Sequence, residues 1–363
     1  MSTKIEWATK VWNVTSGCDK VSPGCENCYA INMSNRLSGI EATKERYAGS
    51  VTKTKGGKLN WSGQIKLHED QLDKPSTWMP KNRVFVNSMS DLFHEDVPFD
   101  FILRVWHKMI WYNGPTYMIL TKRPERALEF FNWMSNVSRK KIDELGINVF
   151  EFCFHKFATT EPPRNIWIGT SAENQEQANK RIPYLLQIPA AVRFLSCEPL
   201  LGPIDLTKIQ HDDFLQTNAI GNDHNGVFRK IKWVIAGGES GHNARPMHPD
   251  WLRSLRNQCQ AAKVPFFFKQ WGEWAFIEEG NEKLKSHKAQ RKNLAITTST
   301  GKLVTIVKDD NNNAYLFEPG TKNRILHKPK GKVIGVMNRV GKKAAGRLLD
   351  GREWNAFPLV EGG

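Results

Sequence analysis

The chain has 363 residues, 40% of them hydrophobic and 25% charged, a composition that excludes a disordered segment or a single small module. Six cysteines are too sparse for a disulfide scaffold, and no apolar run approaches the roughly 18 residues of a membrane span. The 52 basic and 37 acidic residues give a net charge of +15, which attracts polyanions such as nucleic acid. Residues 1–10 lack the apolar core of a signal peptide, so we expect a cytoplasmic protein.

Short apolar or β-branched runs recur along the chain, and stretches long enough for a crossover helix lie between several of them, at 99–112, 175–186 and 250–262. The alternation predicts a parallel α/β fold, namely a complete or partial TIM-type (β/α) barrel over residues 1–272. An open doubly wound sheet is the alternative. The eight runs are Val11–Thr15, Gln64–Leu67, Arg83–Asn87, Tyr117–Leu120, Asn165–Ile168, Val192–Leu195, Trp233–Ala236 and Pro265–Phe268.

Two segments interrupt this repeat. Residues 135–163 are predicted to be an insertion with its own short helix. Residues 273–363 are predicted to be a small basic C-terminal elaboration, with a strand-like piece at 303–307 and a tail helix within 336–358. Residues 275–363 carry 17 basic and 9 acidic side chains, more than half of the positive excess.

Polar residues follow seven of the eight runs. Strand carboxyl ends are where (β/α) barrels build their active sites, so we expect these residues to gather at one rim. In chain order they include Cys18, Cys25, Cys28, Asp91, His94, Lys122, Arg123, Ser171, Glu173, Cys197, Glu198, Gly237, Gly238, Glu239 and Lys269.

Cys18, Cys25 and Cys28 form a C-x6-C-x2-C triplet in a loop that also contains Pro23 and Gly24. Three thiolates fall one short of the usual four, which leaves one iron of an iron–sulfur cluster open for an exogenous molecule such as S-adenosylmethionine. The alternative is a structural zinc site completed by a distant ligand: Cys153, Cys197, Cys259 or His94.

Seven segments, the first of which contains the cysteine triplet, carry a resemblance to a known family. In chain order they are GCDKVSPGCENCYA (17–30), FVNSMSDLFHEDVP (85–98), LTKRPERA (120–127), IWIGTSAENQEQANKRIP (166–183), RFLSCEPLLGPIDL (193–206), WVIAGGESGHNARPMHPDW (233–251) and FFFKQWG (266–272). In these the chain resembles the phage Gp-thirty-seven/sixty-eight family, also called three-Cys-motif proteins, over residues 6–272 and 337–358. It differs in having Val14 where the family has Pro in WNP, and Cys197 where Val is more usual. Cys197 is either an extra thiol at the barrel mouth or a small residue at a strand end.

The resemblance implies a radical-SAM-like enzyme. In such an enzyme the three cysteines ligate a four-iron four-sulfur cluster, and the open iron binds S-adenosylmethionine and cleaves it to a 5′-deoxyadenosyl radical. It also implies an electron donor such as flavodoxin or ferredoxin, and a partner protein encoded nearby. The charge suggests a nucleic acid or nucleotide as substrate.

The expected roles follow from side-chain chemistry, and each has a structural alternative. Glu239 could instead pair with Arg245, Asp91 or Ser90 could cap a helix, and Arg123 could bridge to Glu125 or Glu198. The cofactor-binding candidates are Gly237, Gly238, Glu239, Ser171, Glu173, Lys122 and Arg123, and the catalytic candidates are Asp91, His94 and Lys269.

Two other functions stay open. The first is a zinc-stabilised, non-catalytic nucleic-acid-binding phage or defence protein. The second is metal-assisted hydrolysis through Asp91, His94 and Glu239, which is weaker because the sequence has no two-metal ligand spacing.

Overall fold

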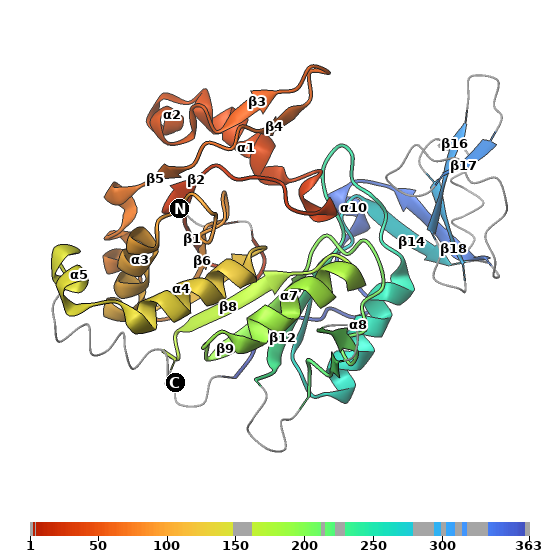
Figure 1. Ribbon diagram of the computed structural model, residues 1–363. Coiled ribbons are helices and arrows are strands. Elements are labelled where there is room, and N and C mark those ends of the chain that lie inside the picture. Colours follow the sequence, from red (N-terminus) through yellow and green to blue (C-terminus); the bar gives the residue numbers. More distant parts are fainter. Residues whose placement is uncertain are drawn as a thin grey trace.

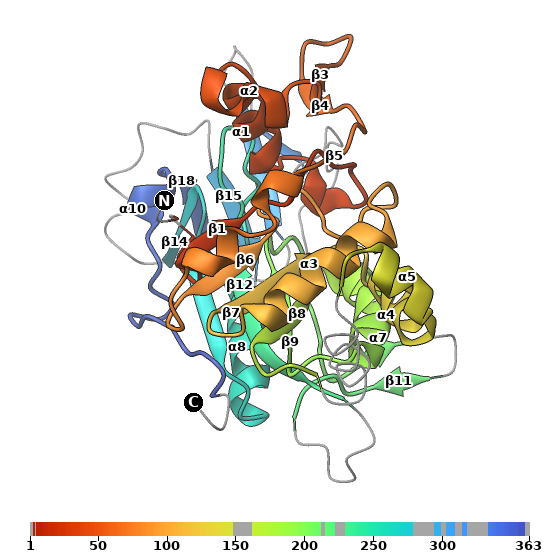
Figure 2. The ribbon, with the colours of Figure 1, turned by 90° about the vertical axis from the view of Figure 1, so that its left-hand side faces the viewer.

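The computed structural model describes residues 3, 5–147, 162–211, 215–221, 229–278, 294–298, 303–308, 314–317 and 333–359. At its centre is a seven-stranded, all-parallel sheet in the order β1-β6-β7-β8-β9-β12-β13, curled into a half barrel (Figures 1 and 2). The predicted parallel α/β architecture is therefore confirmed. The strands are β1 (Lys10–Trp12), β6 (Arg83–Val86), β7 (Thr116–Thr121), β8 (Ile166–Ser171), β9 (Val192–Cys197), β12 (Ile231–Gly237) and β13 (Phe266–Gln270).

Helices cover the outer face of this sheet. Val84 and Val86 of β6 pack with Val105 and Met109 of α3 in one buried cluster, because alternate residues of a strand point to the same face. The predicted crossover helices are present as α3 (Phe99–Trp111), α7 (Gln175–Gln187) and α8 (Pro249–Ala261), and α4 (Pro124–Asn136) and α5 (Arg139–Glu144) complete the layer. Within the described residues, no helix has the length and apolar character needed to cross a bilayer.

The inner face carries an aromatic floor. It is a cluster of buried residues, none of which belongs to a helix, and includes Trp7, Phe85, Met118, Trp167, Phe194, Trp233, Ile235 and Phe267. Towards the carboxyl ends of the strands the inward positions become small or charged, as at Ser171, Ser196 and Lys269. The concave face is thus apolar at its base and polar at its rim.

The two terminal segments close the base of the half barrel. The Phe357 ring lies 5.0 Å from Trp233 and 5.4 Å from Phe267, and the Arg83 guanidinium lies 4.4 Å from the Phe357 ring. Near the start of the chain, Trp7 packs 4.6 Å from Phe85. Residues far apart in the sequence therefore seal the same apolar floor.

A lobe formed by residues 29–68 projects beyond the rim between β1 and β6 (Figures 1 and 2). It holds α1 (Tyr29–Ser38), α2 (Glu41–Tyr47), the hairpin β3 (Val51–Lys53) and β4 (Leu59–Trp61), and β5 (Lys66–Leu67). Here one prediction is wrong: the run Gln64–Leu67 supplies no barrel strand, because β5 pairs antiparallel with β2 (Thr15–Ser16). Gln64 and Lys66 are polar, whereas a central parallel strand needs apolar residues on both faces. Short 3₁₀ turns at Glu69–Gln71 and Lys74–Thr77 lead back to β6.

The C-terminal part forms a separate antiparallel sheet in the order β14-β18-β15-β16-β17. The predicted strand at 303–307 is β16. The predicted tail helix is one turn long, α10 (Lys342–Ala345), because Gly341 and Gly346 on either side have positive φ. The strands are β14 (Trp274–Glu278), β15 (Leu294–Thr298), β16 (Leu303–Lys308), β17 (Ala314–Phe317) and β18 (Val333–Arg339), and a small pair, β10 (Ile209–Gln210) and β11 (Gln216–Thr217), follows β9. Of the predicted insertion at 135–163, residues 148–161 lie outside the described part.

Candidate functional site

The cysteine loop lies across the carboxyl edge of the sheet. Gly17, just before Cys18, forms a backbone bridge with Ser90 beyond β6. Cys25 ends a 3₁₀ turn (Pro23–Cys25), and Cys28 immediately precedes α1. Three side-chain contacts fix the loop to strand ends further round the rim: Gly24 N to Glu173 Oε1 (3.0 Å), Asn27 Nδ2 to Glu239 Oε2 (3.0 Å) and Arg245 Nη2 to Pro23 O (3.0 Å).

Cys18 is backed by a buried ion pair. Arg123 Nη1 lies 3.8 Å from Cys18 Sγ and 3.3 Å from Asp91 Oδ2. Burial raises the pKa of the Cys18 thiol to about 12, with a further increase from the Asp91 charge and an opposing effect from Arg123. Asp91 also accepts hydrogen bonds from Thr121 Oγ1 (2.7 Å) and Lys122 N (2.9 Å), so its oxygens are used to hold the strand ends together. The predicted Arg123 bridge to Glu125 or Glu198 is replaced by contacts with Asp91 and Glu95.

His94 contacts the residue that follows this cysteine. Its Nε2 is 3.2 Å from Asp19 Oδ2, and its Nδ1 accepts from Asp96 N at 3.2 Å. Asp91 Oδ1 accepts from Phe93 N at 3.1 Å, so it stabilises a turn, and the next helix begins only at Phe99. Of the three predicted catalytic residues, Asp91 thus contacts Arg123 next to Cys18, and His94 contacts Asp19 of the cysteine loop.

Glu173 is a fully buried carboxylate under the loop. Arg181 Nη1 lies 2.9 Å from its Oε2, and Lys122 Nζ lies 3.9 Å from it. Burial alone would raise the pKa of Glu173, but the charges of Lys122 and Arg181 and hydrogen bonds from Ser22 and Gly24 lower it to about 2. Ser171 lies on the same strand end, and its carbonyl accepts from Arg181 Nη1 at 3.0 Å.

The Gly237-Gly238-Glu239 segment is used by the protein's own packing. Glu239 forms a two-pronged ion pair with Arg245, with Nη2 2.5 Å from Oε1 and Nε 2.8 Å from Oε2. A Cβ at Gly237 would lie 2.5 Å from Glu198 Oε1, and one at Gly238 would lie 2.0 Å from Trp271 O. The glycines are therefore required by close contacts within the rim.

The mouth of the half barrel is the opening at the strand carboxyl ends beside the cysteine loop. We assign three residues to it: Lys269 of β13, Glu198 directly after β9, and Tyr29 directly after Cys28. Lys269 Nζ lies 3.3 Å from Glu198 Oε1, with 20% and 15% of their side chains exposed. Tyr29 donates to Ser88 O at 2.6 Å while 53% of the residue is exposed. Burial raises the pKa of the Tyr29 hydroxyl, and the charges of Cys28 and Glu198 raise it further.

Two of the three remaining cysteines pack away from this site. Cys197 and Cys259 pack in the apolar cluster between the sheet and its outer helices, so Cys197 is a small core residue on the outer face. Cys153 lies outside the described residues. In the part of the chain that the structure describes, no three His, Cys, Asp or Glu side chains are arranged to hold a metal ion, so the three thiols share one loop without converging on a point.

Comparison with known proteins gives one match. The family model described as "Protein of unknown function (DUF5131)" matches residues 2–358. The chain belongs to the DUF5131 family. No curated protein and no solved structure matches the chain.

Several residues at the rim of this DUF5131 protein make contacts that no motif in the sequence indicated. Asp19, Asn27 and Arg181 hold the cysteine loop or Glu173, but their partners lie 8 to 212 residues away in the chain. Tyr29 was the residue most open to prediction, since an aromatic side chain directly follows Cys28.

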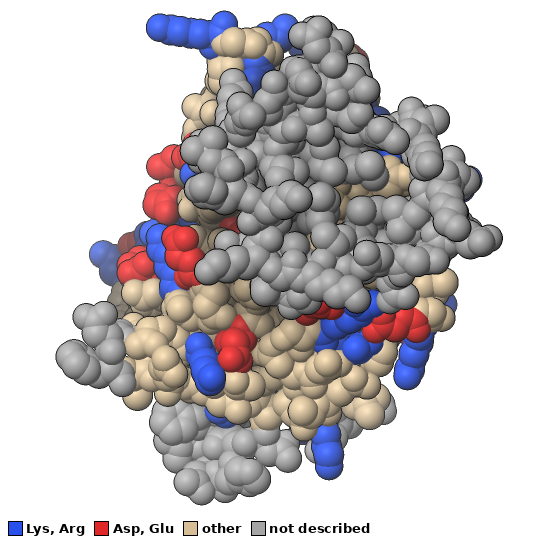
Figure 3. All heavy atoms as spheres, turned by 90° about the vertical axis from the view of Figure 1, so that its right-hand side faces the viewer, with Lys and Arg blue, Asp and Glu red and all other residues tan. Residues whose placement is uncertain are grey.

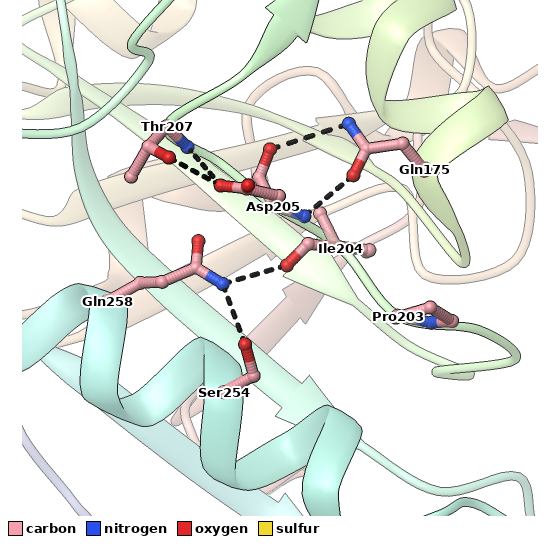
Figure 4. Close-up of a pocket in the computed structure, with 7 residues that line it drawn as sticks. All are labelled: Gln175, Pro203, Ile204, Asp205, Thr207, Ser254 and Gln258. Carbon is pink, nitrogen blue, oxygen red and sulfur yellow. Dashed lines mark hydrogen bonds between the residues drawn. The ribbon is translucent and has the colours of Figure 1, made fainter. Parts of the chain in front are cut away.

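A hollow lies beside the rim, outside the predicted site. It has a volume of about 550 Å³ and lies between the start of α7, the loop after β9, and α8 (Figure 4). Its polar groups bond to one another: Gln175 Oε1 accepts from Asp205 N at 2.6 Å, and Gln258 Nε2 donates to Ile204 O at 2.9 Å. These contacts hold the loop in place and leave few groups for a ligand.

Proposed function

We propose that the chain is a radical-SAM-type enzyme that acts on a nucleic acid or nucleotide. Cys18, Cys25 and Cys28 ligate a four-iron four-sulfur cluster, and S-adenosylmethionine binds its open iron. The scaffold is a partial TIM-type barrel, with residues 273–363 as a basic elaboration. The supporting observation is the position of the cysteine loop, which crosses the carboxyl edge above a concave face with an aromatic floor.

The donor set suits such a cluster. Thiolates are the ligands that iron–sulfur clusters use, and two cations face the sulfurs: Arg123 at Cys18, and Lys122, whose charge opposes the raised pKa of Cys28. Cys28 N donates to Cys25 O at 3.3 Å, so these two cysteines already occupy one turn.

The bound cofactors would supply a 5′-deoxyadenosyl radical once an electron donor such as flavodoxin or ferredoxin reduces the cluster. The chain's own residues shape the space where it acts. The aromatic floor closes the concave face from below. The Lys269–Glu198 pair presents opposite charges to the mouth and is suited to orient a polar substrate.

The position of His94 supports the alternative in which the three cysteines and a fourth ligand bind a structural zinc ion. His94 contacts Asp19, the residue after Cys18, whereas Cys197 and Cys259, the other candidates among the described residues, pack in the outer core. In that alternative the chain is a zinc-stabilised nucleic-acid-binding protein without S-adenosylmethionine chemistry.

The test is metal analysis after anaerobic purification. We expect about four irons and four sulfides per chain, absorption near roughly 400 nm, and 5′-deoxyadenosine after reduction with S-adenosylmethionine present. Cys18→Ala, Cys25→Ala and Cys28→Ala should each lose the iron, whereas Cys259→Ala, which removes a buried thiol from the outer core, should keep it. One zinc per chain and no iron would refute the proposal and favour the alternative.

A further inference from the structure

The lobe of residues 29–68 carries a strong positive charge beside the mouth. It has seven Lys and Arg residues against two Glu residues, a surplus of five from about a tenth of the chain. Lys and Arg side chains stand at the top of the face seen in Figure 3, above the mixed charges lower down. Of the seven cations, Lys44, Arg46 and Lys58 each lie within 4 Å of a carboxylate, and within the described residues the other four form no ion pair.

The β3–β4 hairpin concentrates this charge at its tip. Residues 52–58 are all exposed and include Lys53, Lys55 and Lys58 around Gly56-Gly57. Lys58 lies 3.5 Å from Glu26 of the cysteine loop, which ties the tip to the site. Within the described residues, Lys53 and Lys55 form no ion pair, so their charges face solvent.

Helix α1 connects this hairpin to the mouth. It packs against β3 and β4, begins at Tyr29 and carries the exposed Arg36 near its other end. Its ten residues span about 15 Å. Tyr29 thus presents an exposed ring at the end of the lobe that joins the cysteine loop, and its hydroxyl is held by Ser88, which follows β6 at the rim.

We propose that this lobe binds a single-stranded polynucleotide. Lys53 and Lys55 contact its phosphates, and Tyr29 stacks one unpaired base at the mouth. Cations that follow a backbone and an aromatic ring that takes a base are the two elements of sequence-tolerant single-strand binding. A duplex cannot use the ring, because its bases are already stacked. The inference deepens the function proposed above by naming its substrate class, and it rests on that function only for the chemistry that follows binding.

The experiment measures fluorescence anisotropy of labelled oligo-dT and oligo-U of about 20 nucleotides, and of a duplex of equal length, over a range of salt concentrations. The full chain should bind both single strands more tightly than the duplex. A comparison of the affinities for oligo-dT and oligo-U then shows whether DNA or RNA is preferred. Lys53→Gln/Lys55→Gln should bind more weakly and reduce the slope of log affinity against log salt by about 1.4, since each lost contact removes about 0.7.

The control removes the same charge elsewhere. Lys81→Gln/Lys180→Gln changes two exposed lysines outside the lobe and should leave the slope unchanged. Tyr29→Ala should weaken binding by roughly 5- to 150-fold, and Tyr29→Phe, which keeps the ring, should bind like the original chain.

The inference is overturned if the full chain binds no single strand or binds the duplex equally well. It is also overturned if both lysine pairs lose the same affinity, or if Tyr29→Phe weakens binding as much as Tyr29→Ala. Iron content measured on the same samples separates the two proposals. A zinc-only protein that binds single strands refutes only the radical chemistry, and an iron protein whose lobe variants bind normally refutes only the lobe.

Discussion

Replacing the buried carboxylate of Glu173 tests how the rim is held together. Glu173→Gln keeps the shape of the side chain but leaves the Arg181 guanidinium, which is 4% exposed, without its counter-charge. A carboxyl pKa lowered from 4.5 to about 2 corresponds to about 3 kcal/mol of stabilisation. Breaking a buried ion pair from one side typically costs about 3 to 5 kcal/mol. We therefore expect the free energy of unfolding to fall by about 3 kcal/mol at pH 7.

The pH dependence of this loss has a defined sign. Because the pKa of Glu173 is lower in the folded chain than in the unfolded chain, the unfolded state binds more protons between about pH 4.5 and 2. The stabilisation is complete above pH 4.5 and is lost as the pH falls towards 2. The difference between the original chain and Glu173→Gln should accordingly shrink over this range.

Urea denaturation at several pH values measures this difference. Glu129→Gln is the control, since Glu129 is 60% exposed and 4.0 Å from Arg126, and it should change stability by less than about 0.5 kcal/mol. Glu173→Gln/Arg181→Met should recover part of the loss by removing the uncompensated charge. The reasoning would be refuted if Glu173→Gln lowered the free energy of unfolding by less than about 0.5 kcal/mol, which is typical of an exposed ion pair. It would also be refuted if the double variant were no more stable than Glu173→Gln.

Two further substitutions test the concave face. Phe357→Ala removes a ring from the base of the half barrel and should lower the unfolding free energy by about 2 kcal/mol in thermal or urea denaturation, whereas Leu359→Ala, at a residue that is 96% exposed, should have no effect. Gly169→Ala would bring a Cβ within 2.6 Å of the Phe194 ring and should destabilise the fold by about 1 to 3 kcal/mol, while Gly56→Ala, with no atom within 4 Å, serves as the control. Equal effects of test and control variants in either pair would contradict the packing described for the floor.

Hydrophobic patterning predicted the barrel strands well because they are buried on both faces. The run Arg83–Asn87, for example, contains β6, and the stretch at 250–262 coincides with α8 to within one residue. Patterning was wrong at Gln64–Leu67. Two of these four residues are polar, and the segment contains the short strand β5, which pairs antiparallel with β2 outside the central sheet. It also could not show that the sheet stops at seven strands, because closure depends on curvature and on the terminal segments.

The candidate site was predictable in position but not in role. Parallel strands place their carboxyl ends together, so Asp91, Glu173 and Glu239 were expected at one rim, and the structure brings them there around the cysteine loop. Their oxygens, however, are occupied by Arg123, Arg181 and Arg245. The Glu239–Arg245 pair was one of the alternatives predicted from the sequence and is confirmed. The Asp91–Arg123 and Glu173–Arg181 pairs were not predicted, because residue type and spacing alone do not specify them.

The sealing of the floor by Trp7 and Phe357 has a consequence for synthesis in the cell. The aromatic interior stays open to water until residue 357 has left the ribosome, because the last ring of the seal arrives after every strand of the sheet. A nascent chain therefore exposes a wide apolar surface for nearly the whole of translation, the condition under which chaperones bind and incomplete chains aggregate. Premature termination a few codons early would leave a protein with all seven strands and an unsealed interior.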